Sequence, residues 1–314
     1  MRSNKRLKLQ SRSRWRLFVV LLLLASNHLM NVSVAQEAAD PARKKQSQFV
    51  RLLKEGEEPV ALQTSITTFQ SSGNEKLTVD LIGAIHVGES SYYKLLNERF
   101  RNYDAVLYEL VAPKGTRIPK GGTGDAPSSP VSYMQNGMTE ALGLEFQLDS
   151  IDYTVANFVH ADMTPEEFAQ SMKKREESLG KMFFRAIGQS LVKNSSGDSS
   201  TDLKLMQALL AKETDDRQFK LKRAFAEQFA DLDGAMLVFE GPNGSTLVTE
   251  RNKKALEVLS EVTKDGKTSI GIFYGAGHMK DMAKRLKDDF QMTLKGTSWL
   301  TAWDLVSAAN PERE

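Results

Sequence analysis

Residues 77–88 read LTVDLIGAIHVG, a mostly apolar run rich in β-branched residues that ends at a histidine between glycines. The run has the length of a buried strand, and the serines that follow it can start a helix. Residues 269–278 read SIGIFYGAGH and repeat this arrangement near the other end of the chain. Of the four histidines in the sequence, His86 and His278 close these two Gly-x-x-His segments. The segments therefore predict a pair of strands whose carboxyl ends carry a histidine.

The segments on either side of residues 77–88 predict a hairpin and then a βαβ unit. Residues 59–70 alternate like a strand, and the turn residues SSGN at 71–74 join them to the next strand, which favours an antiparallel hairpin. A helix over about 90–101, capped by Ser90 or the serine after it, precedes another apolar strand at 104–111. A strand, a helix and a strand in this order imply parallel neighbouring strands with a right-handed crossover.

The alternation of helices and strands returns only near the C-terminus. It predicts helices at 246–262 and 279–288 and strands at 269–275 and 292–302. Between the two α/β parts, residues of about 131–235 are expected to form a helical insertion. A Thr164/Glu167 capping box gives this insertion a clear helix start, and that helix is expected to run to about Lys193. We therefore predict a single α/β domain at 52–314, with a central mixed β-sheet, flanking helices and a helical insertion.

Residues 1–35 are predicted to be a secretory signal peptide. They contain seven Lys and Arg residues and no acidic residue, an apolar core at 17–25, and the small-x-small cleavage pattern at 33–35. The apolar core is short beside the roughly 20 residues that span a bilayer, which favours cleavage before Gln36 over an uncleaved membrane anchor. We expect a protein exported to the periplasm or secreted, with a flexible polar lead-in at 36–51 and no membrane span after cleavage.

Composition excludes several classes of partner and site. Outside the predicted signal peptide the chain has 35 basic and 40 acidic residues, a net charge of −5, so a nucleic-acid-binding surface is not expected. Cysteine is absent, which excludes disulfides, thiolate nucleophiles and cysteine-ligated metals. The sequence contains no His-Glu-x-x-His, Gly-x-Ser-x-Gly or phosphate-loop motif. Nothing in it indicates an oligomeric state.

Three residues at predicted strand ends suggest a metal site. In an open parallel sheet, ligands bind beyond the carboxyl ends of the strands, and His86, Glu109 and His278 each lie at such an end. The motif glycines Gly83 and Gly275 keep the nearby backbone unobstructed. Two imidazoles and a carboxylate could bind a divalent cation such as Mn, Co or Zn. The alternative is that both histidines are structural and that Glu109 is a solvated residue at the end of its strand.

Other candidates are weaker. Glu250, Arg251 and Asn252 begin a charged stretch of a predicted helix, a position that is usually solvated. His160 and Asp162, just before the capping box, could add ligands or could form a hydrogen-bonded loop.

These residues together resemble the TraB/GumN family, which includes the TIKI proteases and the pheromone-shutdown proteins. The resemblance lies in four ordered segments, which span about Val60 to Leu305: GAIH at 83–86, YEL at 108–110, ERN at 250–252 and GAGH at 275–278. It implies a fold similar to the erythromycin esterase/ChaN-like group and metal-dependent peptide hydrolysis, in the TIKI branch with manganese or cobalt. Many relatives carry C-terminal membrane segments, and this sequence has none.

The resemblance also implies roles for individual residues. His86, Glu109 and His278 would be metal ligands or catalytic groups, and Arg251 would support the site or hold a substrate carboxylate or an oxyanion. Our leading hypothesis is an exported metal-dependent hydrolase, a peptidase that acts on a peptide or protein substrate. The alternative is a non-catalytic protein of the same fold that binds haem, a metal or a peptide.

Overall fold

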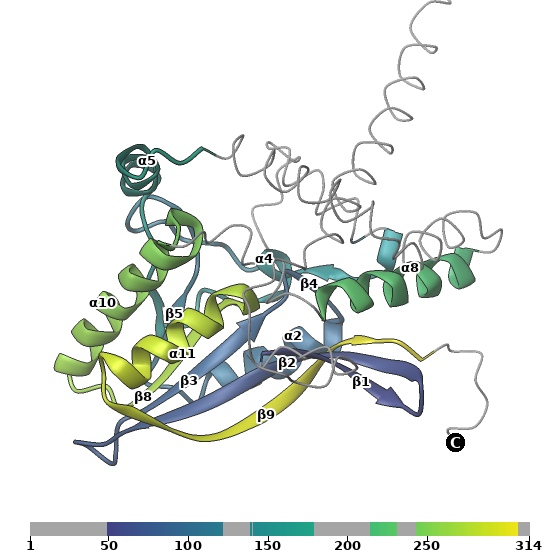
Figure 1. Cartoon of the computed structure of the whole chain (residues 1–314), viewed down its shortest axis with the longest axis horizontal. Coiled ribbons are helices and arrows are strands. Elements are labelled where there is room, and N and C mark those ends of the chain that lie inside the picture. The colour runs from purple at the N-terminus through teal and green to yellow at the C-terminus, as the bar shows by residue number, and fades with distance from the viewer. Residues whose placement is uncertain (1–48, 122–138, 140, 179–213, 231–242, 307–314) are drawn as a thin grey trace, which may run out of the picture.

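The computed structural model describes residues 49–121, 139, 141–178, 214–230 and 243–306 (Figure 1). The strands are β1 (Val50–Glu55), β2 (Glu58–Ser71), β3 (Thr78–Ala84), β4 (Val87–Gly88), β5 (Ala105–Tyr108), β6 (Glu145–Phe146), β7 (Phe158–His160), β8 (Ser269–Gly275) and β9 (Met292–Asp304). The helices are α2 (Ser90–Phe100), α4 (Gln147–Ser150), α5 (Pro165–Lys174), α8 (Thr214–Phe229), the π-helix η2 (Thr246–Glu250), α10 (Arg251–Lys264), the 3-10 helix η3 (Ala276–His278) and α11 (Met279–Asp288). Within this part of the chain no helix is long and apolar enough to cross a membrane.

A seven-stranded mixed sheet forms the centre of the molecule, as the sequence predicted. One edge of the long strand β2 pairs antiparallel with β9. Its other edge pairs with β1 in the first half, at Thr64 with Val50, and with β3 in the second half, at Ile66 with Ile82. From β3 outward the order is β3, β8, β5 and β7, and these four strands are parallel. Their carboxyl ends therefore meet at one edge of the sheet.

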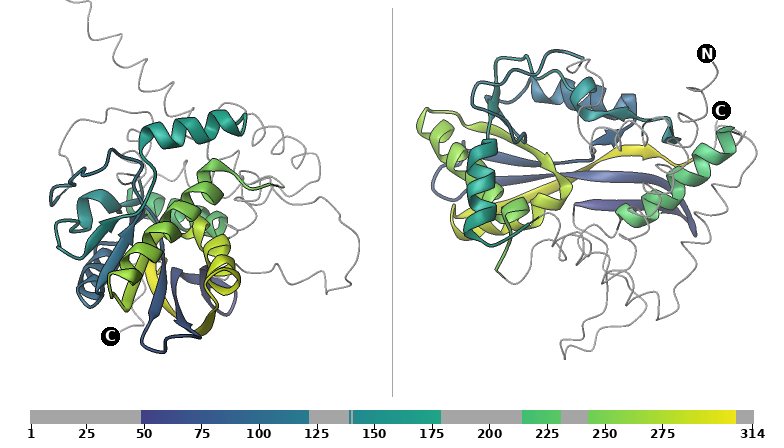
Figure 2. Two further views of the ribbon diagram at one scale, coloured as in Figure 1. Left: turned by 90° about the vertical axis from the view of Figure 1, so that its left-hand side faces the viewer. Right: turned by 90° about the horizontal axis from the view of Figure 1, so that it is seen from above.

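Each face of the sheet has its own hydrophobic core. Figures 1 and 2 show α10 and α11 over one face and α2 over the other. Alternate residues of β3 serve the two cores: Leu81 packs with the α10 and α11 side, whereas Ile82 packs with the α2 side. This alternation is the period of two expected of a strand with both faces covered. Both faces of the sheet are thus covered beside the edge where the parallel strands end.

The position of β8 corrects the predicted βαβ unit. Strands β3 and β5 are parallel, as predicted, but they are not neighbours, because β8 lies between them and pairs with both. The sequence of β8 is apolar at nearly every position, and its residues from Ile270 to Tyr274 are buried. Such a strand is stable in the middle of a sheet, where both of its faces and both of its edges are covered. The two ends of the chain do share one sheet, as the sequence predicted.

Two predictions in the N-terminal half of the chain are wrong: the end of the flexible lead-in and the N-cap of the first helix. The flexible lead-in was expected to reach residue 51, but Val50 and Arg51 belong to β1, where Val50 is fully buried. Neither Ser90 nor the serine after it caps α2. The N-cap is Glu89, whose carboxylate instead accepts a hydrogen bond from Lys222 of α8 at 2.7 Å. A tertiary ion pair therefore takes the side chain that could have capped the helix.

The predicted helical insertion is only partly helical. The Thr164/Glu167 capping box is present, but α5 ends at Lys174 rather than near 193. It ends there in a C-terminal turn, in which Glu176 has φ of +53° and the N–H of Glu177 donates to the carbonyl of Met172 at 2.9 Å. Residues 131–235, which were predicted to be helical, also contain the strands β6 and β7, and β7 is the edge strand of the main sheet. The predicted signal peptide, most of the predicted lead-in and, in the predicted insertion, residues 131–138, 140, 179–213 and 231–235 lie outside the described residues.

Two tyrosines of α2 hold the segment that leads to His86. The Tyr92 hydroxyl donates to the carbonyl of Gly83 at 3.2 Å, and the Tyr93 hydroxyl donates to that of Ile85 at 3.0 Å. Burial raises the pKa of Tyr92 to about 12 and also raises that of Tyr93. The folded state thus keeps these phenol protons more tightly than the unfolded chain does.

This proton binding predicts a loss of stability in alkali. The stabilisation is complete below about pH 10, the pKa of a phenol in the unfolded chain, and is lost as the pH rises through about 10 to 12. In this pH range each such tyrosine lowers the free energy of unfolding by about 1.4 kcal/mol for each unit of pH. Urea denaturation at several pH values checks this, and Tyr92→Phe should make the fall shallower. An equally steep fall in Tyr92→Phe would contradict the assignment.

Candidate functional site

Three of the predicted residues converge at the edge where the parallel strands end. His86 follows β3, Glu109 follows β5, and His278 closes the 3-10 helix after β8. A Cβ atom added to Gly275 would lie 3.3 Å from Glu109 Oε2, 3.6 Å from His86 Nε2 and 3.7 Å from His278 Cδ2. The three side chains therefore surround the last residue of β8. The sequence predicted this cluster, and the absence of a side chain at Gly275 leaves room for it.

The carboxylate of Glu109 lies at the centre of the cluster and is already hydrogen-bonded. Its Oε2 accepts from the backbone N–H of Gly275 at 2.7 Å, and its Oε1 accepts from Arg251 Nη2 at 2.6 Å. His278 Nε2 lies 3.5 Å from the same Oε1. Burial alone would raise the pKa of Glu109, but the charge of His278 when its ring is protonated and that of Arg251 outweigh burial and hold the pKa well below its usual value. Glu109 is therefore a stable carboxylate and a weak base.

Arg251 is shared between two carboxylates rather than lying on a solvated helix face. Besides its bond to Glu109, it donates from Nε to Asp162 Oδ1 at 3.0 Å and from Nη2 to Asp162 Oδ2 at 2.5 Å. The Asp162 side chain is completely buried, and that of Arg251 is 11% exposed. Burial opposes the charge of Arg251, but the two carboxylates raise its pKa. One guanidinium and two carboxylates carry a net charge of −1, which favours a proton or a cation beside the histidines.

A π-helical turn presents Arg251 to the site. The π-helix η2 ends directly before Arg251, and π turns are rare and occur often at functional sites. Arg175 fixes it from outside through the carbonyl of Gly244 and through Glu250 Oε1, the latter at 3.3 Å. Gly244 has φ of +72°, and a Cβ there would lie 2.2 Å from Thr249 Oγ1, so only glycine fits this turn.

The remaining candidates divide into two groups. Asn252 contacts the cluster directly, through a 2.7 Å contact of its Oδ1 with His278 Nδ1, and Asp162 reaches it through Arg251. Glu250 does not, because its carboxylate pairs with Arg175 and Lys253. His160 is also turned away, since its Nε2 lies 2.6 Å from the carbonyl oxygen of Leu110. The loop containing His160 and Asp162 thus supplies an acidic residue to the site and keeps its histidine in a structural hydrogen bond.

Gln147 also belongs to the site, although it was not predicted from the sequence. This buried residue opens α4, and its Oε1 lies 3.0 Å from His86 Nδ1. Its Nε2 donates to the Tyr153 hydroxyl at 2.9 Å, and its backbone N–H donates to the carbonyl of His86 at 2.9 Å. A lone glutamine between two apolar residues gave no signal that could have identified it.

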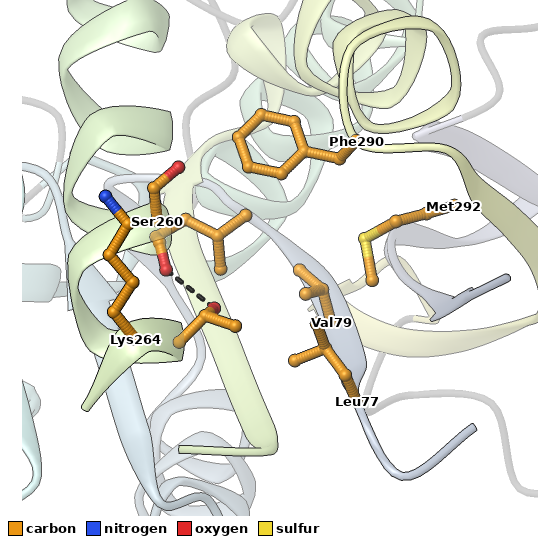
Figure 3. A pocket seen from close by; sticks show the side chains of 8 residues that line it. Leu77, Val79, Ser260, Lys264, Phe290 and Met292 are labelled. Atoms are coloured by element: carbon orange, nitrogen blue, oxygen red, sulfur yellow. Dashed lines mark hydrogen bonds between the residues drawn. The ribbon is translucent and has the colours of Figure 1, made fainter. Parts of the chain in front are cut away.

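An apolar cavity lies elsewhere. It has a volume of about 230 Å³ and is lined mainly by residues at the start of β3 and on α10, among them Leu77, Val79 and Leu259 (Figure 3). It therefore lies toward the amino ends of the parallel strands, away from the histidines. A second cavity, of about 270 Å³, includes Asp162 and His160 in its lining and so borders the Arg251 side of the cluster.

The donor set fits a divalent cation in its chemistry. Two imidazoles and one carboxylate are ligands that Mn, Co and Zn accept, and the net negative charge around Arg251 favours a cation. Among the described residues, however, no three His, Asp or Glu side chains are grouped as a metal-binding cluster. Glu109 would have to share Oε1 between the cation and Arg251.

Comparisons with protein-family models, with curated proteins and with solved structures gave no match for this chain. The resemblance to the TraB/GumN family stays a prediction that rests on the four motif segments.

Proposed function

We propose that the chain is an exported metal-dependent hydrolase, a peptidase whose site is the cluster of His86, Glu109 and His278. The observation that carries the proposal is their convergence around Gly275, because residues far apart in the sequence have no packing reason to place three titratable side chains together. The cluster combines a carboxylate with two imidazoles, and the pKa of its carboxylate, Glu109, is strongly lowered. Such clusters are typical of sites for acid–base and metal chemistry.

The cluster assigns different tasks to its residues. His86 is the one exposed member of the three, so it is the group that a substrate reaches first and the better candidate to move a proton. Glu109, with its lowered pKa, supplies negative charge rather than a base. Arg251 is neutralised by its two carboxylates, so it holds Glu109 in place and has little charge left for an oxyanion.

His86, His278 and Glu109 would hold the divalent cation, Mn, Co or Zn. Such an ion supplies a water of lowered pKa and polarises the scissile carbonyl.

Hydrolysis of a peptide library with added Mn, Co or Zn tests the proposal. We expect His86→Ala and His278→Ala to lower kcat/KM by a factor on the order of 10²–10⁴, the range typical of a lost acid–base group. His160→Ala is the matched control, because it removes the histidine that lies outside the cluster and should keep most of the activity. Equal activity in the wild type and in both cluster variants would refute the mechanism.

The non-catalytic alternative predicts a different result. In that case the wild-type protein binds metal, haem or peptide but cleaves no peptide of the library. His86→Ala should then lose this binding.

A further inference from the structure

Both histidines of the cluster contact a side-chain amide through the same ring atom. His278 Nδ1 lies 2.7 Å from Asn252 Oδ1, and His86 Nδ1 lies 3.0 Å from Gln147 Oε1. The two amides come from different elements, α10 and α4, and both are buried. The Nε2 atom of each ring is left to face the cluster.

The orientation of Asn252 is fixed by its other neighbours. Its Nδ2 donates to the carbonyl of His278 at 3.1 Å and to Asp281 Oδ2 at 2.9 Å. A carbonyl and a carboxylate can only accept, so the amide nitrogen must face them and the amide oxygen must face the ring. Arg285 Nε donates to the same Asp281 oxygen at 2.7 Å and holds this acceptor in place. An amide oxygen cannot donate, and its 2.7 Å contact with Nδ1 is shorter than the 3.5 Å from Nε2 to Glu109 Oε1, so the proton of a neutral His278 ring lies on Nδ1.

Gln147 forms the equivalent arrangement on His86. In the structure its Nε2 donates to the Tyr153 hydroxyl, and in this orientation of the amide Oε1 lies at His86 Nδ1. The two neighbouring tyrosines, Tyr108 and Tyr153, pack with ring centroids 5.2 Å apart and limit the movement of that hydroxyl. The backbone N–H of Gln147 also holds the carbonyl of His86, so both ends of this histidine are tied to one residue.

We propose that Gln147, supported by Tyr153, is a positioning residue that keeps His86 in the Nδ1–H tautomer, as Asn252 does for His278. Both rings then direct an Nε2 lone pair into the cluster, where Glu109 adds a carboxylate. This is the arrangement in which a ring can bind a cation or accept a proton, and a hydrogen bond on the far nitrogen is the usual means of securing it. The consequence for catalysis rests on the proposed function, but the tautomer itself does not.

Nitrogen-15 NMR of metal-free, histidine-labelled protein at about pH 8.5, about two units above the pKa of a model imidazole, tests the proposal. Ring spectra distinguish a protonated from an unprotonated nitrogen, and the His→Ala variants assign the signals. We expect Nδ1–H in both His86 and His278. His160 is an internal reference of the opposite tautomer, because its Nε2 faces a carbonyl oxygen that can only accept.

Variants at Gln147 separate a positioning role from a merely structural one. Gln147→Met removes the acceptor at similar volume, so His86 should lose its preference for Nδ1–H while His278 keeps its own. Gln147→Glu retains an acceptor and should restore the preference. In titrations with Zn, Gln147→Met should bind roughly 10–100-fold more weakly than the wild type, and Gln147→Glu should not.

Two results would overturn the proposal: Nε2–H on His86 in the wild type, or an unchanged His86 tautomer in folded Gln147→Met. Correct tautomers in a protein that hydrolyses nothing would instead count against the proposed function alone.

Discussion

Arg251→Met is expected to lower the free energy of unfolding by about 3–5 kcal/mol, the usual cost of removing one partner from a buried ion pair. The variant leaves two carboxylates without their shared cation, one of them on the completely buried side chain of Asp162. Methionine has a similar length, so lost packing contributes little. Urea denaturation at neutral pH measures the change.

Two further variants test whether the charge is responsible. Adding Asp162→Asn to Arg251→Met removes one of the unpaired carboxylates and should recover part of the lost stability. Lys253→Met is the matched control, because Lys253 is 48% exposed in its ion pair with Glu250 and should cost less than about 1 kcal/mol. Equal losses in Lys253→Met and Arg251→Met would show that Arg251 has no special role.

Gly275→Ala is expected to lower kcat/KM by a factor on the order of 10–100 while the protein remains folded. The backbone of Gly275, with φ of −49° and ψ of 137°, suits alanine, so the substitution adds no backbone strain. Its methyl group would lie 3.3 Å from Glu109 Oε2, so the carboxylate would have to move by a few tenths of an ångström. A misplacement of catalytic groups by about 1 Å can cost about a hundredfold in rate, so this smaller shift is expected to fall at the lower end of the range, about tenfold.

The control for this substitution is Gly296→Ala in β9, where an added Cβ meets no atom within 4 Å. Steady-state kinetics and thermal denaturation of both variants separate an effect on the site from an effect on the fold. Wild-type kcat/KM in Gly275→Ala would mean that the reaction takes place elsewhere.

The sequence predicted the parts of the fold that local patterns encode. Alternation identified β2, the apolar runs identified β3 and β8, and the glycine-flanked histidines identified one end of the sheet. The order of the strands was not accessible in the same way. A local sequence pattern cannot tell whether the two strands of a βαβ unit pair directly or have a third strand between them. The sequence therefore placed β8 in the correct sheet but did not predict that it lies between β3 and β5.

In the candidate site too, the sequence predicted what local patterns encode and not what depends on distant contacts. Strand ends located His86, Glu109 and His278, because backbone direction alone brings strand ends together. The partners of these residues depend on side-chain geometry across distant segments. The sequence therefore left the role of Arg251 open between a solvated face and the site, and it gave no indication that Gln147 contacts His86.

The central position of β8 also governs when the protein can fold. Its partners β3 and β5 are made long before it, and register pairs such as Thr78 with Ser269 and Ala105 with Ile270 join distant parts of the chain. Contacts of such long range slow folding, because the entropy of closing the long intervening loop is lost before the contacts stabilise the sheet. A chain emerging from the ribosome can form the β2–β3 hairpin early, but its parallel sheet and the histidine cluster stay open until the last quarter is synthesised. Assembly of the site is thereby tied to completion of the chain.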